Sequence, residues 1–221
     1  MIKKETFSFI TDLIENNDRD WFQKNKDRYL AAKENVEAFA DAILSQFRKI
    51  DTFIPPELTA KKCVMRIYRD VRFSKDKSPY KNNFGIGVSS KGKGNDGPGY
   101  YIHIQPGNSF VAGGYWMPQA DHLKSIRQEI DYNTKDFLNI IEDRKFKSYF
   151  SDLDQNEKLK TSPKGYEADH PYIELLKLKS FTVTHSFLDV DLMDDKAVEN
   201  VIEGLQLIYP FSIFLNQAIL S

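Results

Sequence analysis

The chain has 221 residues, of which 41% are hydrophobic and 13% are aromatic. A typical domain has about 150 residues, so the chain can form one well-packed domain, and its composition excludes collagen-like and disordered proteins. The 31 basic and 32 acidic side chains give a formal net charge of −1. The whole molecule is therefore not built to coat nucleic acid or an anionic membrane, and any such role requires a local patch.

The cysteine count and the hydropathy pattern indicate the cellular location of the protein. Cys63 is the sole cysteine, which excludes an internal disulfide and a thiolate zinc site. Polar residues at 11–12 interrupt the apolar residues near the N-terminus, so no signal peptide is expected. The most apolar stretch, residues 207–220, is too short to span a bilayer and contains Pro210. We therefore expect a cytoplasmic protein with no membrane partner.

The N-terminal part, about residues 5–50, is predicted to be helical. Apolar residues recur at helical spacing in residues 7–14. They continue with a period of 3.6 through residues 21–47, opposite a charged face, which indicates one long amphipathic helix. Two prolines at 55–56 then end any helix, because proline has no amide donor.

The centre, about residues 62–116, is predicted to be rich in strands. Apolar residues alternate with small or polar ones in residues 84–88 and 100–104, which is typical of half-buried strands. A turn at 106–108 leads into a third strand at 109–112. The glycine-rich residues 92–99 are expected to form a mobile, exposed hairpin loop, because glycine maximises backbone freedom.

The C-terminal part, about residues 118–220, is predicted to return to helices. A strand-like run at 180–187 interrupts them, and Pro210 is expected to end or kink the last helix. This order of helices, strands and helices favours an α+β fold over a doubly wound parallel sheet. We expect a single domain over residues 1–221, with an antiparallel β-meander packed against several helices.

The least ordinary feature of the sequence is the basic segment, residues 61–81. It has eight basic and two acidic side chains, a local net charge of +6. Its β-branched and aromatic residues predict a strand over 64–73. In such a strand Arg66, Tyr68 and Arg72 would share one face, whereas Arg69 would lie among apolar residues and need a buried acceptor.

These residues suit recognition of an anion, because arginine binds phosphate and carboxylate groups through paired hydrogen bonds. We expect a phosphorylated or otherwise anionic small molecule, either simply bound or turned over. The expected ligand contacts are Arg66, Tyr68, Arg72, Lys75, Lys77, Lys81 and His103. Three alternatives stay open: a solvated sheet edge, binding of nucleic acid, and docking of an acidic partner, including the acidic residues 187–203 of another copy.

Several stretches also carry a resemblance to a known family. They are residues 16–22 (NNDRDWF), residues 66–81 (RIYRDVRFSKDKSPYK), residues 99–101 with the glycines at 113–114, and residues 163–165 with 169–171. On these residues the chain resembles the bacterial and fungal conserved hypothetical proteins of domain-of-unknown-function family 2461, from about Phe7 to Phe214. The resemblance implies a cytosolic single domain and assigns no catalytic residues.

The four histidines show no metal-ligand spacing, so we expect neither a bound metal nor a cofactor. His103 is predicted to lie on the polar face of its strand, with Tyr101 and Gln105. Asp169 and His170 precede a proline, which favours a helix cap over a catalytic pair.

Overall fold

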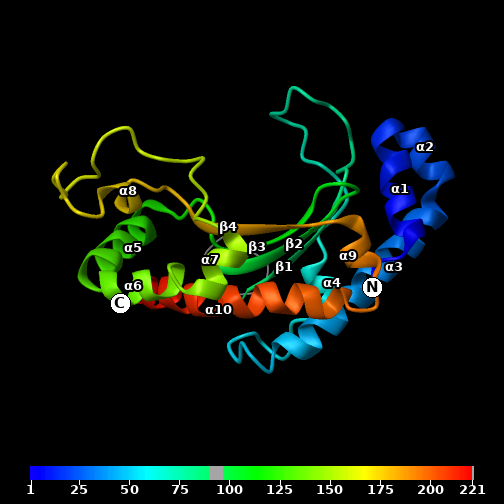
Figure 1. Ribbon diagram of the computed structural model, residues 1–221. Coiled ribbons are helices and arrows are strands. Elements are labelled where there is room, and N and C mark those ends of the chain that lie inside the picture. The colour runs from blue at the N-terminus through cyan, green and yellow to red at the C-terminus, as the bar shows by residue number, and fades with distance from the viewer. Residues whose placement is uncertain (90–96, 221) are drawn as a thin grey trace.

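Four antiparallel strands form one sheet in the order β1-β2-β3-β4, so each strand pairs with the next one along the chain (Figure 1). The computed structural model describes residues 1–89 and 97–220. The strands are β1 (Phe84–Val88), β2 (Gly99–Ile104), β3 (Ser109–Tyr115) and β4 (Phe181–Phe187). Together with the helices around them, they confirm the predicted α+β fold with an antiparallel meander.

A tight turn sets the pairing of β2 with β3. Asn108 N–H donates to the Gln105 carbonyl at 3.0 Å, and Pro106 and Gly107 occupy the two positions between them. Gly107 has a φ of +69°. Proline followed by a residue with positive φ is typical of a type II turn, so these two residues favour the chain reversal that makes the strands antiparallel.

Alternation along the strands gives the sheet one covered and one open face. Tyr100, Ile102 and Ile104 of β2 are buried on the covered face, whereas Tyr101 and His103 are half-buried on the open face. The predicted polar face of β2 is therefore confirmed.

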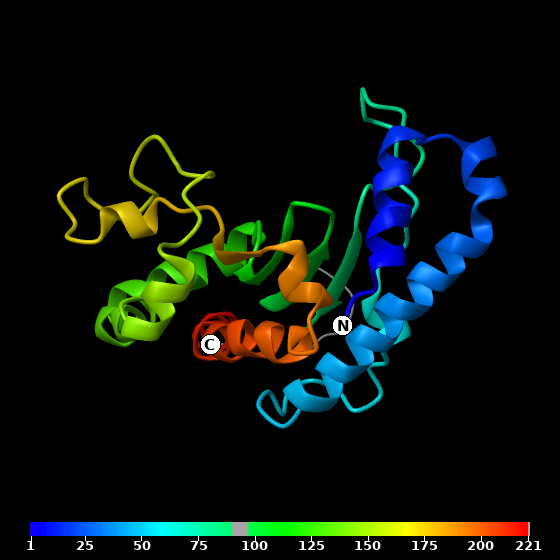
Figure 2. The ribbon, with the colours of Figure 1, turned by 45° about the vertical axis from the view of Figure 1, so that its right-hand side comes forward.

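Helix α10 (Ala197–Leu220) lies across the covered face of the sheet (Figures 1 and 2). Its approach to β3 requires glycine on both sides. A Cβ at Gly113 would lie 2.4 Å from Ile208 Cγ2, and one at Gly204 would lie 2.9 Å from Val111 Cγ1. The helix continues through Pro210, so of the two expected effects, ending or kinking the helix, the first is wrong. Burial of the apolar residues on both sides offsets the roughly 3 kcal/mol that an interior proline costs.

Three N-terminal helices pack beside the sheet edge formed by β1. They are α1 (Lys4–Glu15), α2 (Arg19–Lys24) and α3 (Lys26–Phe47). The long helix expected over residues 21–47 forms only from Lys26 onward, because the backbone leaves the helical conformation at Asn25, with φ −108° and ψ 18°. The Asn25 side chain and its N–H both donate to the Trp21 carbonyl, at 2.9 and 3.0 Å.

The remaining helices are α4 (Ala60–Cys63), α5 (Ala120–Tyr132), α6 (Thr134–Ile141), α7 (Arg144–Phe150), α8 (Ile173–Leu176) and α9 (Asp189–Met193). Helix α8 begins too late for Asp169 to cap it, so that expectation is wrong. His170 instead places Nε2 3.0 Å from Asp131 Oδ1.

Within residues 1–89 and 97–220, no helix is long and apolar enough to cross a membrane. Residues 92–96 of the expected glycine-rich loop lie outside the described residues.

The strand predicted over residues 64–73 does not form. Val64 makes an isolated bridge to Ile86, and the chain then leaves the edge of β1. Within the predicted strand, Asp70 accepts from Arg72 N–H at 3.3 Å, and farther along the chain Asp76 accepts from Ser78 N–H at 2.9 Å. Such local bonds compete with a ladder, and they make residues 69–79 a projecting loop, called the basic loop below.

Candidate ligand-binding site on the open face of the sheet

A cavity of about 510 Å³ lies on the open face of the sheet. Its floor consists of small residues from three strands: Gly87 of β1, Ala112 and Gly114 of β3, and Thr182 and Thr184 of β4. The register places Ala112 between Tyr101 and Thr184 on neighbouring strands. Because Ala112 and the two threonines have short side chains and the glycines have none, they leave room above the sheet.

Larger side chains from distant parts of the sequence form the walls. Met65 comes from the basic segment, Tyr101 from β2 and Phe110 from β3. Trp116 follows β3 and is 61% exposed, and Asp154 comes from the loop after α7. The basic loop and the chain after α7 both project on the side of the sheet opposite α10 (Figure 1).

A polar cluster adjoins this cavity on the same face. The Tyr101 hydroxyl lies 3.0 Å from His103 Nδ1, and the Asn83 amide nitrogen lies 3.3 Å from the same atom. His103 Nε2 lies 2.9 Å from Gln105 Oε1, so Nε2 carries the proton and Nδ1 accepts from Tyr101. The imidazole also stacks on Phe110, with ring centroids 4.6 Å apart.

Burial and a neighbouring cation determine the charge state of this cluster. Burial lowers the pKa of His103, and the nearby Lys81 ammonium lowers it further, while the hydrogen bond to Gln105 raises it. Burial also raises the pKa of Tyr101. The side chains of His103 and Tyr101 are therefore uncharged at neutral pH. Of the seven expected ligand contacts, Lys81 and His103 lie near each other in this cluster.

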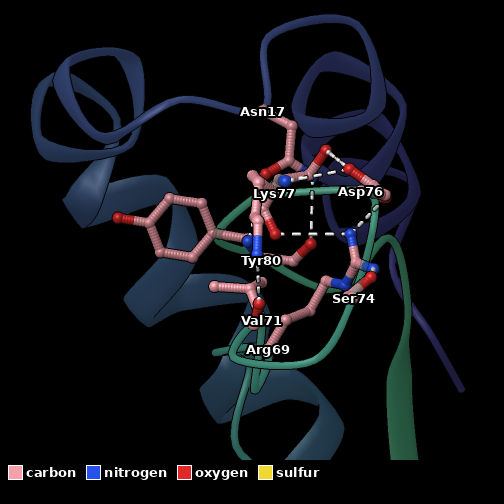
Figure 3. A network of polar contacts seen from close by, with 8 residues as sticks. Asn17, Arg69, Val71, Ser74, Asp76, Lys77 and Tyr80 are labelled. Atoms are coloured by element: carbon pink, nitrogen blue, oxygen red, sulfur yellow. Dashed lines mark hydrogen bonds and ion pairs between the residues drawn. The ribbon is translucent and has the colours of Figure 1, made fainter.

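The basic loop is held in shape by its own side chains (Figure 3). The Arg69 guanidinium pairs with Asp76, and it donates to the Ser78 carbonyl at 3.3 Å and to Ser74 Oγ at 3.4 Å. Lys77 Nζ donates to the Val71 carbonyl at 3.0 Å. Arg69 therefore has the acidic partner that its expected structural role requires. Asp76 is 61% exposed, however, so the expectation of a buried acceptor is wrong.

The other expected contacts lie farther from the polar cluster. Arg66 is exposed and directly follows the cavity wall residue Met65. Arg72 makes a two-point pair with Asp70, at 3.0 and 2.7 Å, and Lys75 is exposed on the basic loop. Tyr68, which is 50% exposed, packs beside the ring of Tyr80 rather than over the sheet.

Sequence reasoning missed several residues of this site. Met65, Asn83, Trp116 and Asp154 were not among the expected contacts, and they come from four separate stretches. Ala112 carried a weak signal of a binding site, because a very small residue within a strand often marks a place where a ligand or another backbone approaches closely. Nothing in the linear pattern indicated that Asp154 would reach the open face.

The fold and the site together define a class of protein: a small α+β domain whose four-stranded meander is covered on one face by a long C-terminal helix and keeps a cavity on the other. Within this class, the chain belongs to DUF2461, described as a conserved hypothetical protein, whose family model matches residues 5–214. The family expected from residues 16–22 and 66–81 is thus confirmed. Among curated proteins and among solved structures, no match was found.

Proposed function

We propose that the protein binds a small anionic ligand on the open face of its sheet. The observation that carries this proposal is the cavity of about 510 Å³, whose Met65 wall belongs to the basic segment. Pockets of roughly 300–1,000 Å³ with apolar walls and a few polar groups are typical of small-molecule sites. The apolar part of the ligand would lie in the cavity, and its anionic group would lie near Arg66 and Lys81.

The charges of the basic segment support this placement. Arg69, Arg72 and Lys77 already have partners inside the basic loop. Arg66 and Lys75 make no hydrogen bond or ion pair with residues 1–89 or 97–220, and Arg66 directly follows the cavity residue Met65. The hydrogen bonds from Arg72 lower the pKa of Asp70, and Arg66, although not hydrogen-bonded to this carboxylate, is close enough to help lower that pKa. Such a guanidinium is the better candidate for an incoming phosphate, because no existing hydrogen bond must be broken.

The proposal includes turnover of the ligand, because His103 of the polar cluster is a candidate general base. A general base must be uncharged at working pH and close to the reacting group. The lowered pKa of His103 meets the first condition. Ligand binding and ligand turnover are therefore both measured in the experiment below.

Isothermal titration calorimetry with phenyl phosphate, and with phenol as its uncharged counterpart, tests the proposal, and phosphate release is followed in the same samples. Phenyl phosphate is expected to bind and phenol to bind more weakly. Arg66→Ala is expected to weaken phenyl phosphate binding by about 1.5–3 kcal/mol, the range for a lost charge-assisted hydrogen bond. Ala112→Leu is expected to abolish binding by filling the cavity.

Arg144→Ala is the matched control, because Arg144 is an exposed arginine at the start of α7. Melting temperatures establish that each variant is folded. The proposal fails if phenyl phosphate does not bind the wild type, or if it binds Ala112→Leu as tightly as the wild type.

A second candidate function, binding of single-stranded nucleic acid, is favoured by one residue of the basic loop. Phe73 is 95% exposed, and the Arg72 guanidinium carbon lies 5.8 Å from its ring centroid. An exposed ring among cations suits stacking on a base, worth roughly 1–3 kcal/mol per base. Fluorescence anisotropy with a labelled oligothymidylate at two salt concentrations tests this candidate. Phe73→Ala is expected to weaken binding and Phe53→Ala, a control that is 64% exposed in the wild type, is not.

A further inference from the structure

One end of the open-face cavity carries an acidic side chain, and the other end lies beside the basic segment. At one end, Met65 N–H donates to the Gly85 carbonyl at 2.8 Å, which places the start of the basic segment along the outer edge of β1. At the other end, Asp154 N–H donates to the Thr182 carbonyl at 2.8 Å, which places Asp154 along the outer edge of β4. A ligand that lies across the sheet therefore meets Asp154 at one end and, at the other, Met65, which the exposed Arg66 follows in the sequence.

The spacing between these ends is longer than a single aromatic ring. The two flanking segments are five inter-strand spacings apart, or about 24 Å between backbones at roughly 4.8 Å per spacing. Side chains extend inward from both edges and shorten this span. The remaining length suits a ring joined through a linker to its anionic group, and phenyl phosphate would occupy only part of it.

The acidic end offers an acceptor to the ligand. Asp154 is half-buried in the cavity wall, and its Oδ1 accepts from Asn156 N–H at 2.9 Å. No hydrogen bond from the described residues reaches Oδ2. A carboxylate oxygen in this state selects a group that carries a hydrogen, such as an amino group, over a carbonyl.

The middle of the cavity suits a planar ring. Ala112 has a short side chain and Gly114 has none, so there is room for a ring above β3. A ring that lies on Ala112 has Phe110 on one side along β3 and Trp116, which follows β3, on the other. Aromatic side chains on both sides favour a flat, polarisable ligand over a branched aliphatic one.

We propose that the ligand is a nucleoside monophosphate with an amino-bearing base, an inference that rests on the proposed function. The amino group donates to Asp154 Oδ2, the base lies on Ala112 against Phe110, and the phosphate lies near Arg66 and Lys81. One molecule then contacts Asp154 at one end of the cavity and reaches the basic segment at the other.

Adenosine and inosine monophosphates test the inference, because their bases differ in having an amino group or a carbonyl at the same position. Calorimetry with the wild type is expected to show roughly ten- to hundredfold tighter binding of adenosine monophosphate, the ratio for one hydrogen bond to a charged group. Asp154→Asn is expected to reverse the preference. The new amide side chain keeps its oxygen on Asn156 N–H and turns its NH₂ group, a donor, toward the ligand.

Asp152→Asn is the control, because Asp152 is exposed two residues away and does not line the cavity. The inference is overturned if phenyl phosphate binds while the two nucleotides bind equally, or if Asp154→Asn binds both as the wild type does. In that case the proposed function stands. If phenyl phosphate does not bind the wild type, the proposed function fails, and the inference that rests on it fails with it. The wild-type comparison of the two nucleotides needs no variant, so it decides the matter even if Asp154→Asn does not fold.

Discussion

The Asn17 side chain makes two hydrogen bonds to the backbone of Tyr80 (Figure 3). Its Nδ2 donates to the Tyr80 carbonyl at 3.0 Å, and its Oδ1 accepts from Tyr80 N–H at 3.1 Å. The ring of Tyr80 stacks on Phe22 of α2, with centroids 3.9 Å apart. The two most specific stretches of the family resemblance, residues 16–22 and 66–81, therefore form one unit that ties the basic loop to the N-terminal helices.

Replacing Asn17 with Ala is expected to destabilise the protein by about 1–3 kcal/mol, because it leaves a partly buried carbonyl and amide of Tyr80 without their partners. Denaturant unfolding followed by circular dichroism measures the loss. Asn82→Ala is the control, since Asn82 is an exposed asparagine near the same loop. Equal stabilities of the two variants would show that the contact contributes nothing.

Gly85→Ala is expected to destabilise the fold by roughly 1–3 kcal/mol through overpacking. The Tyr101 side chain lies over Gly85, and an added Cβ would be 2.7 Å from its hydroxyl oxygen and 2.8 Å from Cε2. Gly87→Ala is the matched control on the same strand, because its Cβ would meet only the flexible end of Met65 at 3.2 Å. A Gly85→Ala protein that melts at the wild-type temperature would contradict this packing.

The pKa of His103 is expected to lie below its ordinary value of 6.5, because the side chain is buried and Lys81 is nearby. A pKa lowered by folding stabilises the protein above about pH 6.5, and this contribution is lost as the pH falls through the lowered value. Lys81→Met is expected to raise the pKa of His103, whereas Lys75→Met leaves it unchanged. Nitrogen-15 NMR titration measures these values and reports which ring nitrogen holds the proton. A midpoint at or above 6.5 in the wild type would refute the environment described for His103.

The pKa of Asp76 is lowered from 3.8 to about 2. The hydroxyl and N–H of Ser78 contribute most, and the Arg69 guanidinium adds to them. A lowered carboxyl pKa stabilises the basic loop above about pH 3.8, and the stabilisation is lost as the pH falls through about 2. NMR titration of the Asp76 carboxyl carbon is expected to show the low midpoint, and Arg69→Met is expected to raise it. An ordinary midpoint in the wild type would mean that the loop is not ordered by this network in solution.

Much of the sheet could be predicted because its determinants are local. The alternation in residues 84–88 and 100–104 sets which side chains share a face, and the turn at 106–108 sets the antiparallel pairing. Arg69 has an acidic partner, but this partner, Asp76, is exposed rather than buried as expected. The strand over 64–73 failed because its β-propensity competes with local bonding, in which Asp70 accepts from Arg72 N–H.

The sequence by itself determined the α+β class, the meander, the family and the concentration of positive charge in residues 61–81, because periodicity, turn residues and charge are properties of short stretches. Only the tertiary structure decided which cations of the basic segment form ion pairs or hydrogen bonds with the described residues and which residues meet on the open face. Asp154 reaches the cavity through a backbone bond to Thr182, and Asn17 holds Tyr80 across 63 residues. Such contacts depend on how separate elements pack together, and packing brings together residues that no local pattern relates.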